Sequence, residues 1–112
     1  ANHRAIVFKQ NALESELKFQ LQSLIDQDDR LAEQIVLNIE SIEPLSEATL
    51  ASSTNSYSIG KADFEAILMA ESNLFNTRLD RLARIRDRLQ VRASLAALVG
   101  GDDLLPAKNT TN

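Results

Sequence analysis

The sequence predicts an all-α fold, a long antiparallel hairpin of two helices with coiled-coil character. Only three glycines and two prolines occur in 112 residues, so the chain is poor in turn formers. Apolar residues recur at steps of three and four along two long stretches, which one short glycine-containing segment separates. A chain of this length holds one domain. Cysteine is absent, which excludes disulfides and thiolate metal sites.

The first helix is predicted over residues 1–56. Its apolar residues follow a heptad-like stripe in which Asp28 and Asn38 fill two positions. A polar residue on such a stripe can fix the register of two paired helices. The stripe consists of Leu17, Leu21, Leu24, Leu31, Ile35, Ile42 and Leu45, and Val36 and Ile39 widen it.

Pro44 interrupts this first helical pattern. Inside a helix it removes the hydrogen bond to the carbonyl of Glu40 and clashes with that carbonyl. Because Leu45, Ala48 and Ala51 continue the helical spacing, we expect a kink at Pro44 rather than a break.

The turn is predicted over residues 57–62 and the second helix over residues 63–99. Gly60 is expected to supply a residue with positive φ in the turn. Asp63 is expected to cap the second helix or to lie in its first turn, where a carboxylate suits the free amides. The glycine pair after Val99 predicts a helix end, which leaves residues 100–112 as a flexible tail.

Two faces are expected on the second helix. The arginine face consists of Arg78, Arg81, Arg84, Arg88 and Arg92. The apolar face is expected to contain Phe64, Ile67, Leu68, Leu74, Phe75, Leu79, Leu82, Ile85, Leu89, Ala93 and Ala96.

Charge is distributed unevenly along the chain. Residues 1–56 carry nine acids and four bases, whereas residues 57–99 carry seven bases and five acids. Asp80 and Asp87 also interleave with the arginines. This distribution favours pairing between an acidic and a basic helix over a nucleic-acid surface, which needs a concentrated basic stripe.

Catalytic and metal-binding patterns are absent from the sequence. It contains no Ser/His/Asp set, phosphate loop or HExxH motif, so we expect neither an enzyme nor a cofactor. His3 is the sole histidine and is expected to be solvated. Asp26, Asp28 and Asp29 lack the glycine and terminal glutamate of a calcium loop. No apolar run of about 18 residues is present, so no transmembrane helix is predicted.

A signature surrounds the predicted turn. Tyr57-x-x-Gly60 is followed by an apolar segment and by a long helix that closes on a glycine pair. This arrangement resembles the carboxy-terminal periplasmic hairpin of TolC-type outer-membrane efflux proteins. The matching residues are Tyr57, Gly60, Phe64, Leu68, Leu95, Leu98 and Gly100. The run from Pro44 to Ala48 is similar to the metal-efflux branch of that family, and the resemblance covers roughly residues 35–101.

The resemblance implies a role in passive export. On this resemblance, the chain would be a fragment of a trimeric α-helical barrel, in the periplasmic part of an outer-membrane protein. The outer-membrane strands would lie upstream, and this fragment itself would not contact the membrane. As part of the tunnel and its tip, the hairpin would dock a periplasmic adaptor that connects to an inner-membrane pump. Small molecules or metal ions would leave through the duct, but the sequence indicates neither the substrate nor the identity of adaptor and pump.

The resemblance also assigns residues. The adaptor contact would consist of Ser58, Ile59, Gly60 and Lys61, and tip packing and gating would involve Tyr57, Asp63 and Phe64. The chain departs from the prototype drug exporter at Ala62, Ala66 and Met69, where that exporter has charged groups. Lys61, Asp63 and Glu65 are then the candidates for a gate.

A second interpretation belongs to a different class. The same apolar stripes would suit a free-standing coiled-coil adaptor or secretion chaperone that binds partner helices. In either case a two-helix hairpin of this size buries too little surface alone, so we expect self-association through the apolar helix faces or association with other chains.

Overall fold

The computed structural model describes the backbone of residues 2–110 and the side chains of residues 2–100. The chain forms helix α1 over Asn2–Leu37, a π-helical turn η1 over Asn38–Ile42, helix α2 over Glu43–Ser58 and helix α3 over Phe64–Thr110. No strand occurs within residues 2–110. The all-α prediction is therefore confirmed for the described chain.

The chain divides into two compact units. The first, which we call the tip unit, comprises Leu31–Asp87 and contains η1, α2 and the turn into α3. The second, the terminal unit, joins the first 30 residues to the chain from Arg88 onward.

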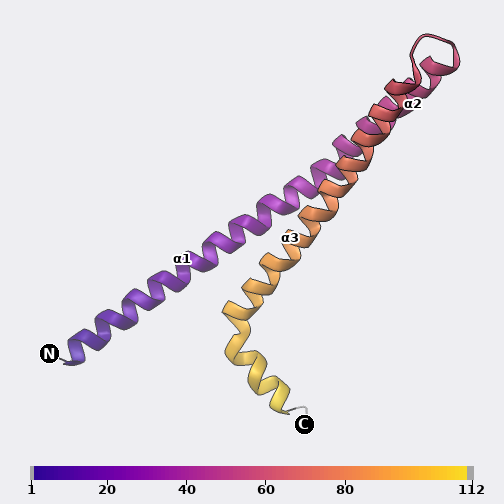
Figure 1. Ribbon diagram of the computed structural model, residues 1–112. Coiled ribbons are helices and arrows are strands. Elements are labelled where there is room, and N and C mark those ends of the chain that lie inside the picture. Colours follow the sequence, from indigo (N-terminus) through magenta and orange to yellow (C-terminus); the bar gives the residue numbers. More distant parts are fainter. Residues whose placement is uncertain (1, 111–112) are drawn as a thin grey trace. The chain divides into compact units, whose positions relative to one another are not determined.

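The tip unit is an antiparallel helical hairpin, in which α2 leads through a short loop into α3 (Figure 1). Three arginines of α3 bond across to the other arm in reversed order. Arg78 pairs with Glu47 and Arg81 with Glu43, and Arg84 donates to Asn38. This order fixes the antiparallel direction, and it confirms the predicted pairing between the basic and the acidic helix.

Pro44 explains the π-helical turn. In an α-helix its ring would collide with the carbonyl four residues earlier, and it has no amide hydrogen to donate. In the structure the amide of Glu43 donates to the carbonyl of Asn38, five residues back, and Pro44 lies in the first turn of α2. The chain thus accommodates the proline by widening one turn, as in the π-bulges found within helices. The chain therefore stays helical on both sides of Pro44, as the apolar spacing predicts, and the irregularity is a widened turn.

The π-helical turn changes which residues face α3. One extra residue in the turn moves the buried positions downstream by one, from the predicted Ile42 and Leu45 to Glu43 and Ser46. The side chains of Ile42 and Leu45 are 37% and 69% exposed. Their placement on the buried stripe was therefore wrong, because a heptad count assumes that the helix has no interruption.

The seam of the tip unit consists of the residues that are buried or half-buried where the two arms face each other. From η1 and its neighbours come Leu31, Ile35, Asn38, Glu43, Ser46, Leu50 and Ser53, and from α3 come Ile67, Ala70, Leu74, Thr77, Arg81 and Arg84.

The predicted apolar face of α3 is only partly correct. Within the tip unit, Ile67 and Leu74 are buried in the seam, but five other members of this face are exposed. The exposed five form a separate row that we call the outer stripe: Phe64, Leu68, Phe75, Leu79 and Leu82. Arg81 and Arg84 lie within the seam instead of on a separate face, so α3 has one mixed seam and one apolar stripe outside it.

The centre of the seam is polar and fully hydrogen-bonded. Asn38 is 1% exposed, its amide nitrogen donates to the carbonyl of Thr77, and its oxygen accepts from Arg84. The hydroxyls of Ser46 and Thr77 lie 3.5 Å apart, and Arg81 donates to Glu43 at 2.6 Å. No buried side-chain nitrogen or oxygen of the described residues lacks a partner. Such a network specifies one register because a shift would leave buried groups unpaired.

In the terminal unit one carboxylate connects the two segments. Asp28 accepts from the Nε atoms of Arg88 and Arg92, at 2.9 and 3.2 Å. Leu21 and Leu24 are half-buried on the α1 side of this unit, as is Leu95 on the α3 side. Asp28, which lies on the predicted apolar stripe and was expected to help fix the register, is thus paired with two arginines.

The end of α3 differs from the prediction. The sequence predicts a helix end at Val99 and a flexible tail over 100–112, yet α3 continues through the glycine pair to Thr110. Glycine disfavours a helix interior by only about 1 kcal/mol relative to alanine and does not by itself end a helix. The last two residues of the predicted tail lie outside the described part of the chain.

We expect the substitution Asn38→Ala to destabilise the chain by about 1 to 3 kcal/mol, because it leaves the Thr77 carbonyl and the Arg84 guanidinium without their shared partner. Chemical denaturation followed by circular dichroism at 222 nm measures this change. Gln34→Ala, at an exposed position one turn earlier, is the matched control and should have little effect. Equal stability of the two variants would contradict the role given to Asn38.

Stability should also depend on pH through Asp28. The hydrogen bond from Arg88, assisted by Arg92 and opposed by burial, lowers the pKa of this carboxyl below 3.8. A lowered pKa in the folded state stabilises the fold above the unfolded value, and this contribution disappears as the pH falls through the folded pKa.

Melting temperatures of the native chain and of Asp28→Asn should therefore differ most near neutral pH and converge below pH 3.8. Asp29→Asn, at an exposed neighbour, should show no such convergence. A gap between native chain and Asp28→Asn that stays constant down to acid pH would contradict the pairing.

Candidate functional site at the hairpin tip

The end of α2 is closed by backbone hydrogen bonds around Gly60. The amide of Lys61 donates to the carbonyl of Ser56 at 2.8 Å, and that of Gly60 to the carbonyl of Tyr57 at 3.1 Å. Gly60 has a φ of 75°. This pair of bonds around a left-handed residue is a Schellman motif, and it satisfies carbonyls that a helix end otherwise leaves free. The prediction of positive φ at Gly60 is confirmed.

Asp63 begins α3. Its Oδ1 accepts a hydrogen bond of 3.2 Å from the amide of Ala66, three residues on. This is the N-cap geometry expected from the sequence, and it satisfies one of the first free amides of the helix. Five residues, 59–63, therefore connect two helix ends that are each capped.

Aromatic packing joins the two sides of the turn. The rings of Tyr57 and Phe64 meet edge to face, with centroids 5.7 Å apart and planes at 62°. Aromatic pairs favour this arrangement, which contributes about 0.5 to 1.5 kcal/mol beyond area burial. Ser58 is held as well, because its hydroxyl donates to the carbonyl of Asn55 at 2.7 Å.

The candidate contact residues Ser58, Ile59, Gly60 and Lys61 are all exposed at the tip. The amides of the last three already donate within the turn. Among the described residues, no hydrogen bond reaches the carbonyl oxygens of Ile59, Gly60 or Lys61. The exposed surface of the tip therefore includes carbonyl acceptors and the apolar side chain of Ile59.

Apart from Gly60 and its two chain neighbours, no residue of the described chain has an atom within 4 Å of the position that a Cβ on Gly60 would take. The glycine is therefore required by its backbone angle and not by crowding within the chain. The open space beside it would allow another molecule to approach the backbone closely.

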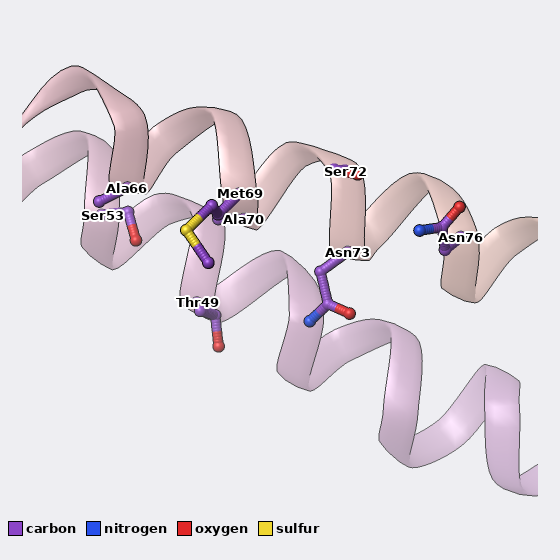
Figure 2. Close-up of a pocket in the computed structure, with 8 residues that line it drawn as sticks. All are labelled: Thr49, Ser53, Ala66, Met69, Ala70, Ser72, Asn73 and Asn76. Carbon is purple, nitrogen blue, oxygen red and sulfur yellow. The ribbon is translucent and has the colours of Figure 1, made fainter.

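An open groove of about 590 Å³ lies between α2 and α3 below the tip (Figure 2). Thr49 and Ser53 line it from α2, and Met69 lies across it from α3. The remaining lining residues are Ala66, Ala70, Ser72, Asn73 and Asn76. None of these lining residues is charged, so this side of the hairpin is a neutral groove.

The charged gate candidates are placed differently from one another. Asp63 is engaged as the cap of α3. No ion pair within the described residues involves Lys61 or Glu65, and both side chains are exposed. Ala66 and Met69 line the uncharged groove.

The described residues contain neither a metal-binding cluster nor a membrane-spanning helix. No group of three His, Asp or Glu side chains there is placed to hold a metal ion. None of the described helices combines the length and the apolar character needed to cross a bilayer.

Comparisons with protein families, with curated proteins and with solved structures found no match to this chain.

The sequence analysis did not predict the π-helical turn or its polar network, although the position of the proline indicates a widened turn. A proline lies six residues after a polar residue on the apolar stripe, and Glu43 lies directly before that proline. A one-residue insertion there would have placed Glu43 opposite the arginines of α3.

Substitution of Gly60 tests the turn. Gly60→Ala should cost about 1 kcal/mol or more, because φ of 75° places a Cβ too close to the following carbonyl. Gly60→Asn should cost less, since asparagine adopts this conformation more readily. Urea denaturation midpoints measure both variants. Equal urea midpoints for Gly60→Ala and Gly60→Asn would contradict the left-handed conformation of Gly60.

Proposed function

We propose that this chain is the periplasmic tunnel and tip segment of a TolC-type outer-membrane efflux channel, a passive duct for small molecules or metal ions. The observation that carries the proposal is the outer stripe of α3, which lies outside a seam that already closes the hairpin. A helix within a closed barrel needs two apolar contacts, one with its own hairpin partner and one with a neighbour.

The other arm of the tip unit supports the same arrangement. Val36, Leu37 and Ile39 are each about half exposed, beside the exposed Leu45. Apolar surface outside the seam is therefore present on both arms. In soluble proteins, large exposed apolar patches mark interaction surfaces. In the proposed channel the hairpins of neighbouring subunits cover them in a trimeric barrel.

The tip geometry supports docking of a periplasmic adaptor. Both helix ends are capped and the Tyr57–Phe64 contact closes the turn, so the backbone at Gly60 is held in one shape. A preformed surface binds with a smaller entropic cost than a loop that orders on binding. Because the free backbone groups at 59–61 are acceptors, the adaptor should supply hydrogen-bond donors.

The alternative is a free-standing coiled-coil adaptor or secretion chaperone. The outer stripe favours it as well, because apolar residues at Leu68, Phe75 and Leu82 are spaced by seven and would suit one partner helix. The two candidates differ at the tip, since a helix-binding protein has no need of an open backbone approach at Gly60.

Export by cells tests the proposal. In a strain that lacks the full-length parent, restored with a native or a variant gene, Gly60→Trp should abolish efflux of dyes, detergents or metal salts. Its indole would occupy the open space beside Gly60 and block docking. Intracellular accumulation of each compound is the measurement.

Two variants separate docking from turn strain. Gly60→Ala brings the same backbone strain without the bulk and should retain most efflux. Asp80→Trp places an indole on an exposed part of α3 away from the tip and should be neutral. Efflux that survives Gly60→Trp would remove the docking role. Normal accumulation of every compound in the deletion strain would instead favour the helix-binding alternative.

A further inference from the structure

Two different sets of residues on one stretch of chain can complete the seam of the tip unit. The observed set, from α2, is Glu43, Ser46, Leu50 and Ser53. The set displaced by one residue is Ile42, Leu45, Thr49 and Ser52. An uninterrupted α-helix would bring this second set to the seam after Asn38, because it continues the steps of four and three.

The two sets differ in chemistry. The displaced set begins with two large apolar side chains, and burying Leu45, now 69% exposed, would be favourable. The observed set begins with an acid and a hydroxyl, which are buried against Arg81 and Thr77. Hydrophobic burial thus favours the register that the structure does not adopt.

Two features hold the observed register. Pro44 disfavours an α-helical turn, since its ring would meet the carbonyl of Glu40. The ion pair between Glu43 and Arg81, at 2.6 Å with the acid 10% exposed, exists only when Glu43 faces α3. Asn38 lies at the start of the widened turn and is a seam position in both registers.

We propose that η1 is a register switch. In its second state the turn at 38–42 closes to an ordinary α-helix, and Ile42 and Leu45 replace Glu43 and Ser46 against α3. The segment from Ile42 to Ser58 then rotates about its own axis by about 100°, the angle of one residue. Pro44 and the Glu43–Arg81 pair keep the chain in the observed state.

The rotation has a consequence at the turn. Tyr57 lies in the last turn of α2 and packs on Phe64, the first residue of α3. Rotating α2 by one residue carries Tyr57 away from that contact. The register at η1 and the shape of the tip are therefore coupled through a single rigid helix, whatever binds at the tip.

The absence of cysteine allows disulfide trapping of each state. Ser46→Cys combined with Thr77→Cys reports the observed register, because the two native hydroxyls lie 3.5 Å apart. Leu45→Cys combined with Thr77→Cys reports the second register. Under mild oxidation of the full 112-residue chain, the first pair should cross-link and the second should stay near background.

Removing the proline should reverse this preference. With Pro44→Ala, the ratio of the 45–77 to the 46–77 cross-link should rise by roughly tenfold or more, because the α-helical turn is then allowed. Glu43→Gln keeps the proline but weakens the ion pair, and it should shift the ratio in the same direction by less. Ser41→Ala, at an exposed position in η1, is the matched control and should leave the ratio unchanged.

Circular dichroism of each variant separates a register change from unfolding. Retained helix content with an increased 45–77 cross-link supports the switch. If Pro44→Ala leaves the 46–77 pair dominant and the 45–77 pair at background, the proposal is overturned. Loss of both cross-links also overturns the proposal, because a chain packed in the second register would still form the 45–77 cross-link.

Discussion

Pro44, whose ring would collide with the carbonyl of Glu40 in an α-helix and which has no amide hydrogen, is the constraint on which the tip unit depends. The amide of Glu43 therefore donates to the carbonyl of Asn38, five residues back, and this inserts one residue into the helical repeat. That insertion decides which side chains of α2 meet α3. It brings an acid to Arg81 and a hydroxyl to Thr77, and it leaves the apolar Ile42 and Leu45 outside the seam.

The result is a hairpin whose interior is more polar than its flanks. The Glu43–Arg81 ion pair and the Ser46–Thr77 contact hold α2 in the observed register, whereas much of the apolar surface lies on the outer stripe and around Val36. Polar contacts at a helix seam specify one arrangement at some expense of stability. In the proposed channel, neighbouring subunits would cover the apolar surface that stays exposed in the described chain.

The sequence could predict the helices, the turn at Gly60, the cap at Asp63 and the pairing of the arginines, because each rests on local chemistry. It could not predict which residues of α2 face α3, because the spacing of apolar residues does not indicate where a turn is widened. Leu68 and Phe75 look as suitable for a core as Ile67, and only the partner helix decides between them. The glycine pair after Val99 also led to a wrong prediction of the helix end. The low helix propensity of glycine lowers the stability of a helix only modestly and does not by itself end it.

Scalar couplings across hydrogen bonds, measured by NMR on isotope-labelled chain, test the widened turn most directly. The account predicts a coupling between the amide nitrogen of Glu43 and the carbonyl carbon of Asn38, which the observed hydrogen bond transmits. A coupling from Glu43 to the carbonyl carbon of Ile39 instead would show an ordinary α-helical turn. The seam would then pass through Ile42 and Leu45, and the central claim would be contradicted.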